Sequence, residues 1–239
     1  ANNWYEITTP DGKREKITKR VTDLVKTWYK KNFPGKKFSK AEEQFNELKR
    51  TYGIAGHADF QEIIGRYYDT ATGKKRETPL PAPDKINLPD FKMYSKLENY
   101  VAEFLATLDP NTIVFSEQVI YDPKDKRAGT IDFIAIEPDG TAHILDWKFM
   151  HITGDDVAWF KQGAFDIQLG KYRQILREYY GIKKFGKVRA IPIAMEFALA
   201  TKGDLSSRYL SKIAVSSVNP SDMDDVRLLP IPEAGEKTG

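Results

Sequence analysis

The sequence predicts a mixed α/β domain, in which helices flank a central sheet of parallel and antiparallel strands. Strand patterns follow one another over 112–149, a long helical pattern covers about 164–180, and one more strand pattern follows at 187–199. A meander of strands followed by a crossover helix and a further strand gives a mixed sheet with helices on its faces. Because 239 residues can bury one substantial core, we expect a single domain over 1–239.

The first 68 residues are predicted to form an N-terminal helical lobe that begins with a short hairpin. Pro10-Asp11-Gly12 is typical of the turn between two antiparallel strands. From Val21 onward, apolar residues recur at the spacing of one helical face, and Pro34-Gly35 ends this pattern.

Two further helices are expected within residues 1–68. Ser39 and Glu42 have the spacing of a capping box, so a second helix is predicted to begin there. We expect this helix to stop near Gly53 and a third helix to follow Gly56-His57.

The rest of the chain divides into three expected parts: a Pro-rich loop (69–92), a core (93–199) and a C-terminal extension (200–239). Within the core the expected elements are a helix over 97–108, strands over 112–121, 129–137 and 141–149, a helix over 164–180 and a strand over 187–199. In the extension, 211–218 and 226–231 are candidates for edge strands or packing arms.

The composition excludes several classes of protein. The absence of cysteine rules out disulfides, thiolate zinc sites and iron–sulfur clusters, so any metal must be held by oxygen and imidazole ligands. No apolar run is long enough for a membrane span and no N-terminal segment is of signal-peptide type, so we expect a cytoplasmic protein without a membrane partner. The net charge of +3 does not by itself predict a nucleic-acid binder.

Three charged residues in the predicted hairpin around Pro138-Asp139-Gly140 suggest chemistry. Asp132 interrupts an apolar strand, and Asp146 and Lys148 share one face of the next strand. Hairpin pairing would bring Asp132 and Asp146 roughly opposite each other, where two buried carboxylates repel unless a cation lies between them. Oxygen ligands favour Mg²⁺ or Mn²⁺, and such an ion beside a lysine is suited to phosphodiester hydrolysis.

Five motifs in this order resemble the PD-(D/E)XK nuclease superfamily and, within it, the RecB-like branch. The resemblance spans about residues 20–197, and the motifs in chain order are Gly56-His57, Glu117 in Ser-Glu-Gln-Val, Gly129-Thr-Ile-Asp132, Ile144-Leu-Asp146-Trp-Lys148 and Gln168-Leu-Gly-Lys-Tyr172. The fold implied is a restriction-endonuclease-like core, with 93–199 as the catalytic part of one nuclease domain.

The resemblance also implies a role for each matched residue. The implied metal ligands are His57, Asp132, Asp146 and the backbone carbonyl of Trp147. Lys148 would act on the attacking water, Gln168 and Tyr172 would line the active site on one helical face, and Glu117 would support the site from the neighbouring strand.

The implied activity is that of a Mg²⁺- or Mn²⁺-dependent deoxyribonuclease acting on single- or double-stranded DNA, without an iron–sulfur cluster. The chain has no Gly-x-x-x-x-Gly-Lys-Ser/Thr motif, so unwinding would need another polypeptide, as in a helicase–nuclease machine or a longer protein. The alternative is a catalytically silent nuclease-fold module that binds DNA or a protein partner. Whether cleavage would be exonucleolytic or endonucleolytic stays open.

Structural roles are the alternative for several of these residues. Asp146 and Lys148 could form a simple ion pair, and His57 could be a helix cap or a core histidine. Gln168 and Tyr172 could equally belong to the core. No role is predicted for His143 or His151. In the loop before the long helix, we interpret Asp155 and Asp156 as capping or solvated residues and Trp159 and Phe160 as apolar anchors.

Overall fold

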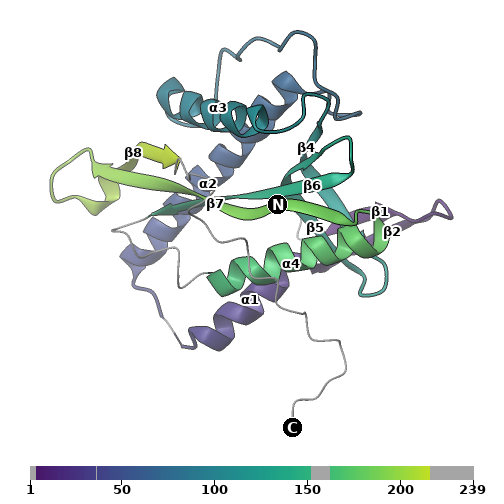
Figure 1. The fold of residues 1–239 in the computed structure, drawn as a ribbon. Helices are drawn as coiled ribbons and strands as arrows, with labels where there is room; N and C mark the ends of the chain where they lie inside the picture. The colour runs from purple at the N-terminus through teal and green to yellow at the C-terminus, as the bar shows by residue number, and fades with distance from the viewer. Residues whose placement is uncertain (1–3, 36, 152–161, 216–239) are drawn as a thin grey trace.

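The computed structural model describes residues 4–35, 37–151 and 162–215 as three layers, with a sheet between two layers of helices (Figure 1). The elements in chain order are β1 (Tyr5–Thr8), β2 (Arg14–Ile17), β3 (Lys19–Arg20), α1 (Val21–Asn32), α2 (Lys40–Tyr67), α3 (Phe91–Ala106), β4 (Ile113–Asp122), β5 (Arg127–Ile136), β6 (Thr141–His151), α4 (Gln162–Tyr179), β7 (Lys184–Leu199) and β8 (Arg208–Val215). The predicted strands and the helix before β7 are confirmed, within a few residues at each end.

The sheet is mixed, as predicted. β4, β5 and β6 form an antiparallel meander, α4 crosses over to β7, which runs parallel to β6, and β8 returns antiparallel to β7. The turn at Gly140 has a φ of +88°, a conformation that glycine adopts without a steric penalty. β1 and β2 form the predicted hairpin as a separate two-stranded sheet.

Each face of the sheet buries its own apolar core. Phe133, Leu145 and Trp147 pack on one face with α2 and α3, whereas Ile134 and Ile144 pack on the other face with α1 and α4. Neighbouring strand residues thus point to opposite cores, as the pleat requires.

The helices of the predicted N-terminal lobe are divided between these two cores, so they do not form a layer of their own. Val21 of α1 belongs to the core on the α4 side, whereas Phe60 of α2 belongs to the core on the α3 side. Figure 1 shows α1 and α4 on one face of the sheet and α2 and α3 on the other. Apolar periodicity identifies the buried face of each helix but not the side of the sheet that it covers.

The predicted break between Gly53 and Gly56 is wrong, because α2 is one helix of 28 residues. It begins at the predicted capping box, with the backbone N–H of Ser39 donating to Glu42 and the N–H of Glu42 donating back to the Ser39 hydroxyl. A Cβ on Gly56 would lie 2.0 Å from the Phe149 ring. Glycine is therefore present for close packing against β6 rather than to end the helix.

The Pro-rich loop contains no regular strand or helix between Asp69 and Asp90, as predicted. It is fixed to α2 by the buried carboxylate of Asp59, which accepts the backbone N–H groups of Asn87 and Leu88. α3 then begins at Phe91, earlier than predicted, because Asp90 caps it by accepting the N–H of Met93.

Some predictions fall outside the described residues. They are the capping or solvated role of Asp155 and Asp156, the anchoring role of Trp159 and Phe160, the candidate strand at 226–231 and the end of the candidate at 211–218, whose first part belongs to β8. In the part of the chain that the structure describes, no helix has the length and apolar character needed to cross a membrane.

Candidate active site

The candidate site lies where β5 exchanges one neighbour for another. On one edge, β5 pairs with β3 at Arg127 and Ala128 and with β6 only from Phe133 to Ile136, so no pairing on this edge covers 129–132. The last β5–β6 pair is Phe133 with Leu145, which places Asp132 and Asp146 one step further, at the point where the two strands separate. The predicted opposition of the two carboxylates is thus confirmed.

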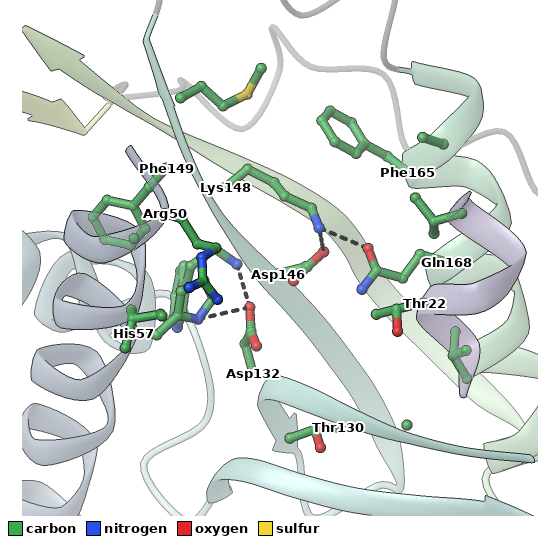
Figure 2. A pocket seen from close by; sticks show the side chains of 18 of the residues that line it. Thr22, Arg50, His57, Thr130, Asp132, Asp146, Lys148, Phe149, Phe165 and Gln168 are labelled. Carbon is green, nitrogen blue, oxygen red and sulfur yellow. Dashed lines mark hydrogen bonds and ion pairs between the residues drawn. The ribbon is translucent and has the colours of Figure 1, made fainter. Parts of the chain in front are cut away.

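Asp132 occupies this opening and contacts both β6 and α2. Its carboxylate accepts the backbone N–H of Trp147 at 2.8 Å, and the same oxygen lies 3.5 Å from Nδ1 of His57 (Figure 2). The hydrogen bond replaces the ladder bond that β6 loses where it leaves β5. His57 thus approaches the hairpin from a helix more than 70 residues earlier in the chain.

Glu117 completes a three-residue group with His57 and Asp132. One ligand atom from each of the three side chains lies within 4.8 Å of the others, and Glu117 is 4.0 Å from Nδ1 of His57. Glu117 has a φ of +52° in the middle of β4. A non-glycine residue in this region is strained, and here the strain coincides with a carboxylate that faces other titratable groups.

A second chain of contacts begins at Asp146 and leads to α4. Nζ of Lys148 lies 2.7 Å from Asp146 and donates to Oε1 of Gln168 at 2.7 Å (Figure 2). The Gln168 amide donates to the Tyr172 hydroxyl at 3.1 Å, and this hydroxyl donates to the backbone carbonyl of Thr130 at 2.9 Å. Gln168 and Tyr172 are buried, but both are tied to the candidate site rather than to apolar packing alone.

Trp147 lies between these two groups, and its side chain points away from them. The indole stacks on Phe60 at 4.0 Å between ring centres, in the core on the α2 side. Asp146 and Lys148 therefore share the opposite face, as predicted. In a strand the N–H and C=O of one residue point to the same side, so the Trp147 carbonyl faces the opening that its N–H faces.

The carboxylates have strongly perturbed pKa values. Burial, reinforced by the charge of Asp132 and opposed by Lys148, raises the pKa of Asp146 to about 7. Burial also acts to raise the pKa of Asp132, but hydrogen bonds from His57 and from Asp146 outweigh it and the pKa is lowered. The pair thus carries its proton on Asp146 and its charge on Asp132.

The other two members of the three-residue group respond to the same charges. Burial acts to lower the pKa of His57, but Asp132 and the charges of Asp146 and Glu117 raise it overall. Burial raises the pKa of Glu117, helped by the charge of Asp146 and opposed by His57. The three carboxylates and the imidazole therefore influence one another's protonation, and a bound cation would favour the charged form of each carboxylate.

One predicted ligand lies outside the three-residue group. Asp146 faces Lys148 and is not a member of the group formed by His57, Glu117 and Asp132. The oxygen that the ammonium contacts is Oδ2 of Asp146, so a bound cation would compete with Lys148 for this carboxylate.

The site opens into a cleft of about 640 Å³ between α2 on one side and α1 and α4 on the other. Val25 and Phe165 line its apolar side, whereas Lys49 and Arg50 line the α2 side. The sequence analysis did not predict these two basic residues. They lie eight and seven positions before His57, so on a continuous helix all three residues share one face. The wrongly predicted break in α2 prevented this inference from the sequence.

Comparison with known proteins gives no family for this chain. No protein-family model matches it, and no curated protein matches it significantly. The geometry and chemistry of the cleft are therefore the basis on which a function can be proposed.

Proposed function

We propose that this protein is a metal-dependent nuclease that hydrolyses phosphodiester bonds in DNA, with a core of the PD-(D/E)XK type and its RecB-like branch. The observation that carries the proposal is the convergence of His57, Asp132, Asp146 and Lys148 on one cleft, although they come from α2, β5 and β6. Gln168 from α4 joins them through Lys148.

The donor set fits Mg²⁺ or Mn²⁺. His57, Glu117 and Asp132 offer one imidazole nitrogen and two carboxylates within coordination reach of one another. The Trp147 carbonyl faces the same opening, and the Asp146 carboxylate beside it, which contacts Lys148, would add a further oxygen ligand. Oxygen-rich sets of this kind suit Mg²⁺ and Mn²⁺, and the imidazole favours Mn²⁺.

Each residue then has a stated task. When bound, the ion would lower the pKa of a bound water and withdraw negative charge from the phosphate. Lys148 is held between Asp146 and Gln168, where its ammonium can orient the attacking water and neutralise charge that develops on the phosphate oxygens. Tyr172 fixes the Gln168 amide, and so keeps its carbonyl oxygen directed at Lys148.

The direct test is cleavage of labelled single- and double-stranded DNA with Mg²⁺ or Mn²⁺. Asp146→Ala and Lys148→Ala should abolish cleavage while circular dichroism shows an unchanged fold. The exposed residues Asp139 and Lys212 provide matched controls, since their alanine variants should cleave normally. EDTA should stop the reaction, and Ca²⁺ should permit binding with little turnover.

Normal cleavage by Asp146→Ala would overturn the proposal. DNA binding by the wild-type protein without cleavage in either metal would favour the alternative, a catalytically silent nuclease-fold module. In such a module, the contact between Lys148 and Asp146 would be a simple ion pair.

A further inference from the structure

Three basic residues, two of which line the cleft, lie near one another around the Phe45 ring. Lys49 of α2 and His151, the last residue of β6, both line the cleft that contains Asp132 and Asp146. Arg208, the first residue of β8, adjoins them across the Phe45 ring. No part of the proposed reaction uses these three basic residues.

The ring of Phe45 holds the group together. The Arg208 guanidinium lies 4.0 Å from the ring centre, and Nζ of Lys49 lies 4.7 Å from it. The His151 ring packs edge-on against Phe45 at 5.1 Å, and Phe197 contacts both rings. Cation–π contacts of this kind hold long basic side chains in place.

The electrostatic environment of His151 shows the sign of the potential. Burial lowers the pKa of His151, and the positive charges of Lys49 and Arg208 lower it further. Three basic groups from separate elements are thus brought together although they repel one another. A bound anion would relieve this repulsion.

The path from the candidate metal ligands to this group follows one edge of β6. β6 pairs with β7 as far as His151, but on its other edge pairing with β5 ends at Leu145. The described edge from Asp146 to His151 therefore borders the cleft. At a rise of about 3.3 Å per residue, His151 lies about 10 Å along the strand from Lys148.

We propose that Lys49, His151 and Arg208 form a phosphate subsite that binds a second phosphate of the nucleic-acid strand whose scissile phosphate lies at Asp132 and Asp146. The inference rests on the proposed function for the identity of the strand. Because the three residues are basic, the subsite would bind an anion. Because Lys49 and His151 line the same cleft as Asp132 and Asp146, that anion would be a phosphate of the same strand.

The experiment measures binding of a fluorescently labelled single-stranded 20-mer by anisotropy in EDTA, where cleavage cannot interfere. Arg208→Gln should weaken binding about tenfold and reduce the slope of log K against log salt by about 0.7, the value for one phosphate contact on a single strand. Lys212→Gln, the same change on an exposed residue of β8, should bind within twofold of wild type.

Methylphosphonate substitution then locates the contact. Phosphates of the 20-mer are replaced one at a time by the uncharged analogue, with the strand fixed by a 5′ label. Wild type should lose affinity at a phosphate removed from the scissile position, and Arg208→Gln should be insensitive to that same substitution. Equal sensitivity of both proteins at every position, or unchanged binding by Arg208→Gln, would overturn the subsite.

The outcome is separable from that of the proposed function. A position-specific loss of affinity in wild type that Arg208→Gln does not show, together with absent cleavage by wild type in Mn²⁺, would retain the subsite and reject the nuclease. Cleavage by wild type with unchanged binding by Arg208→Gln would do the reverse. His151→Gln and Lys49→Gln provide further variants from other elements, and each should give the same positional insensitivity.

Discussion

Removing the charge of Asp146 should stabilise the metal-free protein at alkaline pH, the opposite of what loss of a structural ion pair does. Burial raises the pKa of Asp146 from its ordinary value of 3.8 to about 7, even though Lys148 lies 2.7 Å away. Because the folded pKa is the higher one, the folded protein binds more protons than the unfolded chain within this window. Its free energy of unfolding therefore falls as pH rises from about 4 to 7.

The expected size of the effect follows from the same pKa. At about 1.4 kcal/mol per pH unit, the difference between the two values sets an upper limit of about 4 kcal/mol above pH 7. Asp146→Asn also leaves Lys148 without its carboxylate, which offsets part of the gain. We expect a net increase in the free energy of unfolding of about 1–3 kcal/mol at pH 8 and little change at pH 5.

Urea denaturation in EDTA at pH 5 and pH 8 measures this difference. Asp122→Asn is a matched control, since Asp122 is equally buried and bonded to Lys171 at 2.8 Å but has a lowered pKa. That variant should be destabilised at pH 8. The reasoning fails if Asp146→Asn is destabilised as much as Asp122→Asn, because the carboxylate would then be a structural partner of Lys148.

Three further predictions follow from the same contacts. Gly56→Ala should lower the free energy of unfolding by about 1–3 kcal/mol, because the added Cβ would overlap the Phe149 ring. Gly53→Ala, whose added Cβ would have its nearest contact at 3.7 Å, should raise the free energy of unfolding by up to about 1 kcal/mol. Urea denaturation of both variants measures the difference. Calorimetric Mn²⁺ affinity should fall up to about tenfold per pH unit below pH 7, as Asp146 takes up its proton; equal affinity at pH 5.5 and 7.5 would contradict this. Tyr172→Phe, which loses the hydrogen bond to Thr130, should reduce kcat about tenfold with KM unchanged; a pure KM effect would contradict a positioning role.

Much of the fold can be predicted from the sequence, because its signals are local. The turn at Gly140 and the capping box at Ser39 and Glu42 depend on neighbouring residues, and both are present in the structure. The continuity of α2 could not be predicted in this way, because the reason for Gly56 is the Phe149 ring, more than 90 residues further along the chain. Local glycine rules cannot include a partner at that distance.

The candidate site was predictable to a similar extent. Asp132, Asp146 and Lys148 were identified because charges inside apolar strands need a reason. Glu117 has a positive φ, and a glutamate at this position does not indicate such a conformation in the sequence. The proximity of Glu117 to His57 could therefore not be predicted from local patterns. The contact between Asp146 and Lys148 follows from their spacing of two residues on one strand, which the sequence does show.

The exchange of strand partners along β5 explains why polar residues can be buried at this place. Between its pairing with β3 and its pairing with β6, one edge of β5 has no ladder partner over 129–132, and the carboxylate of Asp132 takes the N–H of Trp147 in place of a backbone acceptor. The Asp132 carboxylate thus has a structural task, accepting the Trp147 N–H, at the place where a cation could also bind. Asp132 can keep its charge there, whereas Asp146 is deprived of charge until pH rises or a cation arrives. The same gap adjoins the cleft that Asp132 and Asp146 both line.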